Sequence, residues 1–269
     1  PAFAARLAAL ADIYVDDAFS CAHRAHASII GVPGLLPAAA GRLMQKELEA
    51  LKAALEEPEH PVAAIVGGNK ISTKLGVLEN LIAKVDHLLI GGAMVHTFLL
   101  ADGIDVGRSL AEPEMVDTAR RIIDAANGNG CRLTLPTDVR VAAELAETAD
   151  SKAVSVDAIP DRMMALDIGP KTAAAMNAVI TQCRTVIWNG PLGAFEFPPF
   201  DSGTNSVARL VAERTRSGAL KSIAGGGDTM AALVQARAAA DFSYVSLAGG
   251  AFLEWLQGRE LPGIAALKT

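Results

Sequence analysis

Apolar residues along this chain follow two alternating patterns. Short continuous apolar runs bounded by glycine or polar residues are typical of buried strands, and longer segments with apolar residues every three or four positions predict amphipathic helices. The predicted strands are Ile13–Val15, Val62–Val66, His87–Ile90, Arg132–Leu135, Thr185–Trp188, Lys221–Ile223 and Tyr244–Leu247. The predicted helices are Gly41–Leu55, Thr73–Leu81, Pro113–Asn127, Lys171–Ile180, Gly203–Arg216 and Thr229–Ala239.

This alternation of strands and helices predicts an α/β fold. Short, continuously apolar strands suit a parallel sheet with helices on both faces, a Rossmann-like arrangement of three layers. A polar break with two prolines, Glu56–Pro61, separates a long helix from the first deeply apolar strand. The elements before the break are too few to close a core, whereas the part after it, roughly 200 residues, is enough for a complete domain.

Composition and charge exclude some classes of protein. Hydrophobic residues make up 51% of the chain and charged residues 20%, which predicts a folded protein, and no apolar run reaches the length of a membrane span. The net charge of −6 argues against a nucleic-acid partner. Three distant cysteines without a CxxC pair fit a reducing cytoplasm. The N-terminus has neither a signal peptide nor Met, so we expect the chain to start within a domain.

The segment Ile223–Val234 runs from a strand through three glycines into a helix. Glycines allow an anion to approach the backbone closely, and a helix N-terminus favours negative charge. A carboxylate in such a turn would repel phosphate unless a cation joined them, so we expect Asp228 to contact nucleotide-bound Mg²⁺. The alternative is a tight turn in which Asp228 is the helix N-cap.

A second strand-to-helix turn, Val66–Lys74, carries two lysines four residues apart. This spacing predicts that Lys70 and Lys74 lie on one face near a helix start, where a phosphate between them would explain cations that oppose the helix dipole. A solvated helix face is the alternative. The segment is not a Walker A loop, because GxxxxGK[ST] is absent.

Three further segments carry candidate binding groups. His23 and His26 flank Arg24, which can bind a carboxylate or a phosphate. A metal site formed by the H-x-x-H pair is the alternative, but no third His or Cys follows at ligand spacing. Asn189 and Glu196 lie in a turn and could meet ribose, although turn chemistry explains them equally well. Gly91–Ala93 could place backbone against a flat ring, and Asp138 is expected to be structural. Most of these segments follow strand ends, which converge at one edge of a parallel sheet.

Six segments carry a resemblance to a known family. In chain order they are Asp17–Phe19 with Ala22–Ser28, Gly67–Lys74, Leu166–Pro170, Trp188–Pro191, Gly225–Thr229 and Leu261–Gly263. They resemble the motifs of the phosphoglycerate kinases, over essentially the whole chain. The resemblance implies a two-lobed monomer that transfers a phosphoryl group between 1,3-bisphosphoglycerate and MgADP, giving 3-phosphoglycerate and MgATP.

The resemblance also implies roles for individual residues. Arg24, helped by His23 and His26, would contact phosphoglycerate, while Lys70 and Lys74 would contact the transferring phosphoryl group and the nucleotide phosphates. The residues implied to contact the nucleotide phosphates and Mg²⁺ are Gly226, Gly227, Asp228 and Thr229. Glu196 is implied to contact the ribose. The residues implied to surround the nucleoside are Gly92, Ala165 and Asn189.

The resemblance further implies a division of the chain. We expect a remnant of the substrate lobe in residues 1–40, an interdomain helix in 41–57, the nucleotide-binding lobe in 58–257 and a returning tail in 258–269, with most of the substrate lobe missing. The sequence departs from the family's pattern at Asn69, at Ala165 in place of Gly, and at the hinge, where Leu247–Phe252 replaces Thr-Gly-Gly-Gly-Ala-Ser.

Two other functions are weighed against this interpretation. One is a non-catalytic, truncated nucleotide-binding module that associates with itself or a partner through its exposed remnant. The other is a dinucleotide oxidoreductase, which the absence of GxGxxG followed by an acidic residue disfavours.

Overall fold

A computed structural model describes residues 1–268 and has a six-stranded parallel sheet at its centre. Its strands are ordered β11-β10-β9-β3-β4-β5. Their bounds are β3 Val62–Val66, β4 His87–Ile90, β5 Arg132–Thr134, β9 Thr185–Asn189, β10 Lys221–Gly225 and β11 Tyr244–Ser246. All six were predicted from the apolar runs, within two residues at each end. The same runs explain the burial, since all five residues of β3 are buried.

Helices cover both faces of this sheet, which confirms the predicted three-layer α/β fold. Successive strand residues point to opposite faces, so Ala64 and Val66 belong to one core cluster while Ala63 and Ile65 belong to the other. On the first face lie α2 (Arg42–Leu55), α3 (Leu75–Ile82), α4 (Val95–Ala101), α5 (Val116–Gly128) and α9 (Gly249–Leu256). On the second lie α6 (Pro170–Gln182), α7 (Ser202–Arg216) and α8 (Gly227–Gln235). Within residues 1–268, no helix combines the length and apolar character needed to cross a membrane.

A smaller antiparallel sheet was not predicted. It has the order β7-β6-β8, formed by β6 Asp138–Ala142, β7 Ser151–Ser155 and β8 Met164–Ile168. Charged side chains interrupt its apolar residues, as Arg140 does in β6, so no continuous apolar run marks it. Asp138 is structural, as expected, because its carboxylate accepts hydrogen bonds from the backbone N–H groups of Lys171 (3.0 Å) and Thr172 (2.7 Å) at the start of α6.

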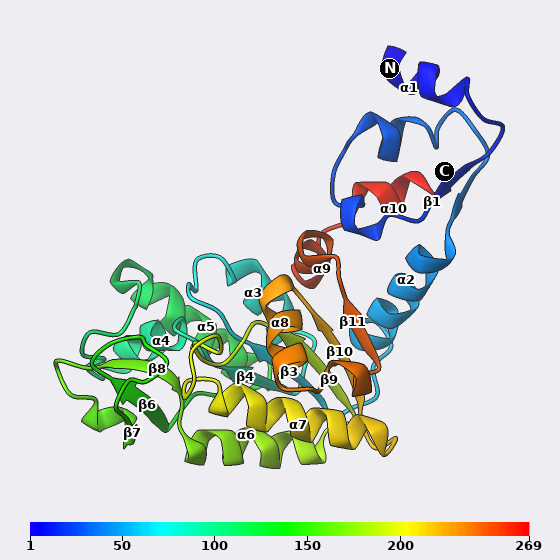
Figure 1. Ribbon diagram of the computed structural model, residues 1–269. Coiled ribbons are helices and arrows are strands. Elements are labelled where there is room, and N and C mark those ends of the chain that lie inside the picture. Colours follow the sequence, from blue (N-terminus) through cyan, green and yellow to red (C-terminus); the bar gives the residue numbers. More distant parts are fainter. Residues whose placement is uncertain (269) are drawn as a thin grey trace.

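The two ends of the chain meet in a separate unit. Figure 1 shows α1 (Ala2–Ala8) and β1 (Tyr14–Asp16) near α10 (Pro262–Ala266), joined to the larger body through α2 and α9. β1 pairs in parallel with β2 (Ala38–Ala40), which was not predicted. The Gly263 N–H donates to the Ala22 carbonyl over 2.8 Å, which ties α10 to the N-terminal part. Thr269, the last residue of the predicted tail, lies outside the described residues.

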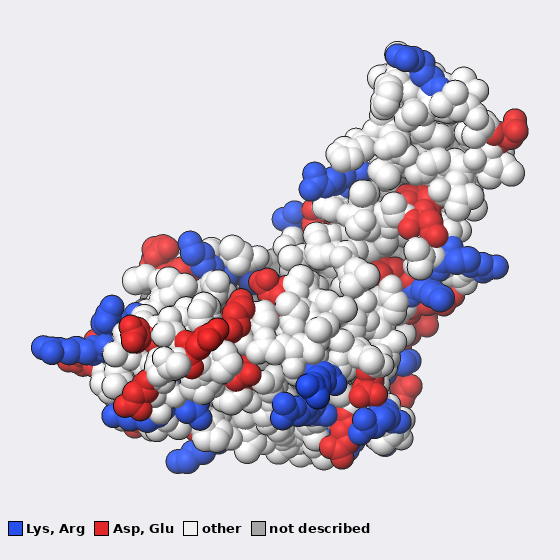
Figure 2. All heavy atoms as spheres, in the orientation of Figure 1, with Lys and Arg blue, Asp and Glu red and all other residues white. Residues whose placement is uncertain are grey.

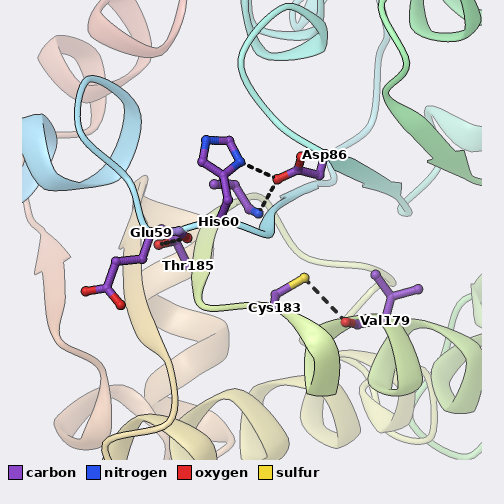
Figure 3. Close-up of polar contacts among 7 residues, drawn as sticks. Glu59, His60, Asp86, Val179, Cys183 and Thr185 are labelled. Atoms are coloured by element: carbon purple, nitrogen blue, oxygen red, sulfur yellow. Dashed lines mark hydrogen bonds and ion pairs between the residues drawn. The ribbon is translucent and has the colours of Figure 1, made fainter.

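Polar contacts join the segments that enter the sheet at the amino ends of its strands (Figure 3). His60 Nδ1 lies 2.6 Å from Asp86 Oδ2, and the same oxygen accepts the Val62 N–H at 2.6 Å. The Thr185 hydroxyl donates to the Glu59 carbonyl over 2.8 Å. This edge of the sheet is therefore closed by the protein's own hydrogen bonds. The candidate nucleotide-binding residues in the segments that follow β3, β4, β9 and β10 lie at the opposite edge.

Candidate functional site

The turns that follow β3 and β9 touch each other at two glycines. The Gly67 N–H donates to the Asn189 carbonyl over 2.9 Å, and a Cβ on Gly67 would lie 1.9 Å from the Pro191 carbonyl oxygen. Gly190 has a φ of 98°, which side chains rarely adopt. Both positions therefore require glycine, and the contact sets the distance between the loop that carries Lys74 and the loop that carries Asn189.

A hydrogen-bonded chain continues from Lys74 across this contact. The Lys74 ammonium donates to Asn189 Oδ1, and Asn189 Nδ2 donates to the Gly225 carbonyl over 2.7 Å. That carbonyl also accepts the Thr229 hydroxyl at 2.9 Å, and the Thr229 Oγ1 accepts the Gly190 N–H at 2.7 Å. Asn189 is buried and fully engaged. Asn189 therefore lies between the turns that follow β3 and β10, and it orients both the Lys74 ammonium and the glycine-rich turn.

The two lysines do not share a helix face as the sequence spacing predicted. α3 begins only at Leu75, with Lys74 as its N-cap, and Lys70 is exposed in the preceding loop. A turn closed by the Thr73 hydroxyl on the Lys70 carbonyl (2.8 Å) separates the two. Burial lowers the pKa of Lys74, and the nearby Asp228 carboxylate opposes this shift. Lys74 is therefore a partly desolvated cation facing an acidic group.

Asp228 does not cap the helix, so the alternative interpretation of this residue is wrong. The N-cap of α8 is Gly226, with a φ of 106°, and no side chain makes a capping hydrogen bond at this end of the helix. Asp228 lies in the first turn with its side chain exposed. Gly227 is exposed as well. The arrangement leaves backbone N–H groups at the start of α8 free to meet an anion, with a carboxylate beside them.

A cavity of about 430 Å³ adjoins these loops. Four of the predicted nucleotide contacts, Gly92, Ala165, Glu196 and Asp228, line it. The others are not among its lining residues: Lys74 directly precedes α3, Asn189 ends β9, and Gly226, Gly227 and Thr229 lie at the start of α8. The remaining lining residues are Gly68, Asn69, Ala93, Val95, His96, Leu110, Val139, Leu145, Met164, Leu166, Asp167, Ile168, Pro191, Leu192, Gly193, Ala194 and Phe197.

The wall of the cavity contains a buried carboxylate to which the sequence analysis gave no role. Asp167 accepts hydrogen bonds from the N–H groups of Ile168 (2.9 Å) and Gly203 (2.7 Å) and from the Ser202 hydroxyl (3.1 Å). Burial raises the pKa of Asp167 to about 7, although these hydrogen bonds act in the opposite direction. The residue ties the start of α7 to the cavity wall. Its position inside the Leu166–Pro170 motif was the available signal.

A second overlooked carboxylate holds the lysine loop. Glu112 is 8% exposed, and its carboxylate accepts the Ser72 hydroxyl at 2.5 Å and the Ser72 N–H at 3.1 Å. Its own N–H donates to the buried Thr97 hydroxyl over 3.0 Å. Burial acts to raise the pKa of Glu112, but the hydrogen bonds from Ser72 and the charge of Lys70 outweigh it and lower the pKa. Glu112 therefore fixes the loop that carries both lysines.

We expect Glu112→Gln to lower the free energy of unfolding by about 2 kcal/mol, because a partly buried charge-assisted hydrogen-bond pair loses its charge and one oxygen acceptor. Urea denaturation at neutral pH measures this. Because the folded-state pKa is lowered, the contribution is present above the ordinary glutamate pKa and is lost as the pH falls through the lowered value. The exposed Glu114→Gln is the control, and an equal effect of the two substitutions would refute the anchoring role.

The predicted substrate cluster lies apart from the cavity. Arg24 and His26 are exposed, and His23 packs against the start of α9, where a Cβ on Gly250 would lie 2.9 Å from His23 Nε2. None of the three lines the cavity. Residues 1–268 contain no group of three or more His, Cys, Asp or Glu side chains that could hold a metal ion.

Comparison with known proteins gives a consistent result. The family described as "Phosphoglycerate kinase" matches residues 1–259. A phosphoglycerate kinase of Cereibacter sphaeroides is 58% identical over 267 residues, covering 99% of this chain and 67% of the relative. One of Dinoroseobacter shibae is 59% identical over 269 residues, covering 100% and 68%. The chain thus spans about two thirds of the length of these curated relatives.

Solved structures show the same likeness. Phosphoglycerate kinase from Coxiella burnetii superposes with a TM-score of 0.95 at 46% identity and covers 99% of this chain and 68% of that one. The enzyme from Pyrococcus horikoshii gives a TM-score of 0.82 at 29% identity and covers 98% and 65%. Fold and sequence therefore agree over almost every residue of this chain.

Proposed function

This chain belongs to the phosphoglycerate kinase family, and on that premise we propose that it binds ADP or ATP with Mg²⁺ at the carboxyl edge of its parallel sheet. The family is one of phosphotransferases, and its reaction moves a phosphoryl group reversibly between 1,3-bisphosphoglycerate and ADP. The single observation that carries the proposal is the hydrogen-bonded chain from Lys74 through Asn189 to the glycine-rich start of α8, beside a cavity of about 430 Å³.

The arrangement suits phosphoryl transfer, which needs positioning and charge neutralisation more than covalent chemistry. The cavity would hold the nucleoside between Gly92 and Ala165, with Glu196 at the ribose. The free N–H groups of Gly227 and the first turn of α8 would take the phosphates. Lys74, already held by Asn189, would need little reorganisation to meet the transferring group, and the exposed Lys70 would approach it from the same loop.

Asp228 fits a nucleotide-bound Mg²⁺. Magnesium in nucleotide sites is usually held by one or two carboxylates together with substrate phosphates, and it retains several waters. Asp228 supplies one exposed carboxylate in the cavity wall at a helix start, so the nucleotide would have to supply the other charged ligands. When bound, the ion would neutralise phosphate charge that Lys74 and α8 leave uncompensated.

We expect Asp228→Asn to diminish the Mg²⁺ dependence of nucleotide binding, because the amide has no charge with which to hold the ion. Isothermal titration calorimetry with ADP, with Mg²⁺ and with EDTA, measures the ratio of dissociation constants. We expect this ratio to fall about tenfold, since a charged contact is worth about 1.5 kcal/mol or more. Asp241→Asn, which removes a half-buried carboxylate outside the cavity lining, is the control, and a wild-type ratio in Asp228→Asn would refute the metal role.

For phosphoglycerate we infer a site at Arg24, with His23 and His26 beside it. Arginine can hold a carboxylate or a phosphate with two parallel hydrogen bonds, which a lysine cannot. Phosphoglycerate-dependent consumption of ATP, coupled to an optical readout, tests the whole proposal. Activity that Arg24→Ala abolishes and Arg121→Ala keeps would support both sites. Nucleotide binding without such activity would support only the nucleotide part.

We also propose the division into residues 1–40, 41–57, 58–257 and 258–269 given above, and a cytoplasmic location in keeping with the family's glycolytic role.

The alternative of a self-associating module has one observation in its favour. Large apolar side chains are exposed in the N-terminal part, among them Leu10 (82% exposed) and Ile13 (64%), and Figure 2 shows that end of the molecule mostly uncharged. Sedimentation at several concentrations measures it, and a constant monomer mass would exclude it.

A further inference from the structure

The cavity contains a histidine that the proposed function does not use. His96, in α4, is 3% exposed and lines the cavity together with Leu110 and Ala165. Its Nδ1 lies 2.8 Å from the Leu110 carbonyl oxygen. A carbonyl oxygen can only accept a hydrogen bond, so Nδ1 is the nitrogen that carries the proton.

The other ring nitrogen is left as an acceptor. Burial lowers the pKa of His96, and the hydrogen bond to Leu110 opposes this only in part, so the ring is neutral at neutral pH and Nε2 has a free lone pair. No residue within 1–268 hydrogen-bonds to Nε2. Nε2 is also absent from the fully buried, unpartnered polar atoms. It is therefore accessible, and the surface that His96 exposes is the cavity wall.

The other polar side chains in the wall do not offer a buried acceptor of this kind. Both Asp167 oxygens already accept hydrogen bonds from the protein. Asn69, Glu196 and Asp228 are exposed. The residues that share the wall with His96 are mainly apolar, namely Val95, Leu110, Val139, Met164 and Ala165. A ligand group that donates a hydrogen bond inside an otherwise apolar slot would therefore be recognised by His96.

The position of His96 matches the base rather than the phosphates of a bound nucleotide. The proposed phosphate end, at Asp228, follows β10, whereas His96 follows β4. The sheet order places these strands three spacings apart, or about 14 Å. A nucleotide whose phosphates lie at the start of α8 would extend across β9 and β3 toward α4. Its base would then reach the wall that contains His96.

We propose that His96 Nε2 accepts a hydrogen bond from the exocyclic amino group of the nucleobase, so that this site prefers 6-aminopurine nucleotides to 6-oxopurine nucleotides. The inference rests on the proposed nucleotide binding and adds its base specificity. A 6-oxo group would place an oxygen lone pair against the Nε2 lone pair. A site built to pair a donor rejects an analogue that lacks it, because its own acceptor stays unpaired.

The test compares the binding of ADP and IDP, which differ in the group at position 6 of the purine and in the proton that the 6-oxopurine carries on N1. Calorimetry of each nucleotide with Mg²⁺ gives two dissociation constants, and we expect the wild type to bind ADP about tenfold more tightly than IDP. His96→Phe keeps a ring of similar size without the acceptor and should remove most of this preference. His96→Gln keeps an acceptor oxygen and should retain part of it. His87→Phe, on β4 outside the cavity, is the matched control and should keep the full preference.

The ratio of the two dissociation constants separates base recognition from a structural role. Loosening of α4 by loss of the hydrogen bond to Leu110 would weaken ADP and IDP alike and leave the ratio unchanged. A ratio in His96→Phe equal to that of the wild type, or no preference in the wild type, would overturn the inference while the proposed nucleotide site stands. Absence of binding of either nucleotide to the wild type would overturn the proposed function and this inference with it.

Discussion

Lys74→Ala is expected to weaken the binding of MgADP about 10- to 100-fold, the cost of losing a charge-assisted contact of about 1.5 to 3 kcal/mol. The ammonium is partly desolvated and already directed by Asn189, so it meets a phosphate without much loss of side-chain freedom. Removing it also leaves Asn189 Oδ1 without its donor. Isothermal titration calorimetry of MgADP into wild type and variant gives the ratio directly.

The control for Lys74→Ala is Lys84→Ala, which removes an exposed lysine beyond the other end of α3. Both substitutions remove one positive charge from the same part of the chain, so a difference between them reflects position and not net charge. Equal affinities in the Lys74 variant and the wild type would remove Lys74 from the nucleotide site. The hydrogen-bonded chain across the loops would then have only a structural role.

Gly67→Ala is expected to lower the free energy of unfolding by about 3 kcal/mol, because a new Cβ has no space without moving backbone. The Cβ would lie 1.9 Å from the Pro191 carbonyl oxygen and 2.8 Å from that of Gly190. Relief of this overlap requires the turns after β3 and β9 to separate. We therefore expect the variant to lose nucleotide affinity as well as stability, since the Lys74 to Asn189 contact crosses the same junction.

Gly128→Ala is the matched control for Gly67→Ala. Gly128 ends α5, and a Cβ there would meet no atom within 4 Å. Because alanine is the better helix former, we expect stability to be unchanged or slightly higher. Urea denaturation of the three proteins measures the differences. A Gly67→Ala variant as stable as the Gly128→Ala variant would show that the two turns do not need their close approach.

The central sheet could be predicted because its strands are short, continuous and apolar. The bounds of Val62–Val66 and His87–Ile90 were predicted to the residue. A strand that is buried on both faces is apolar at successive positions and shows no alternation with polar residues. The β6–β7–β8 sheet escaped prediction because charged side chains, such as Arg140 in β6 and Lys152 in β7, interrupt its apolar residues and leave no continuous apolar run. α1 and α10 escaped for a different reason, because packing between distant ends of the chain decides them more than local periodicity does.

The candidate site was predictable where glycines and charges follow a strand directly. Asp228 and Lys74 were found in this way, although their local geometry was not, because spacing alone could not show that α3 begins after Lys74. His96, Glu112 and Asp167 were missed as candidates. His96 and Glu112 are brought to the site from a helix and a loop by tertiary packing, and no motif at their positions marks them.

The most direct test of the account is a calorimetric titration of ADP into this chain, with Mg²⁺ and again with EDTA. We expect saturable binding at one site with Mg²⁺ and clearly weaker binding without it, since Asp228 and the start of α8 need the ion to share the phosphates. Absence of binding under both conditions would contradict the proposed nucleotide site at the carboxyl edge of the sheet.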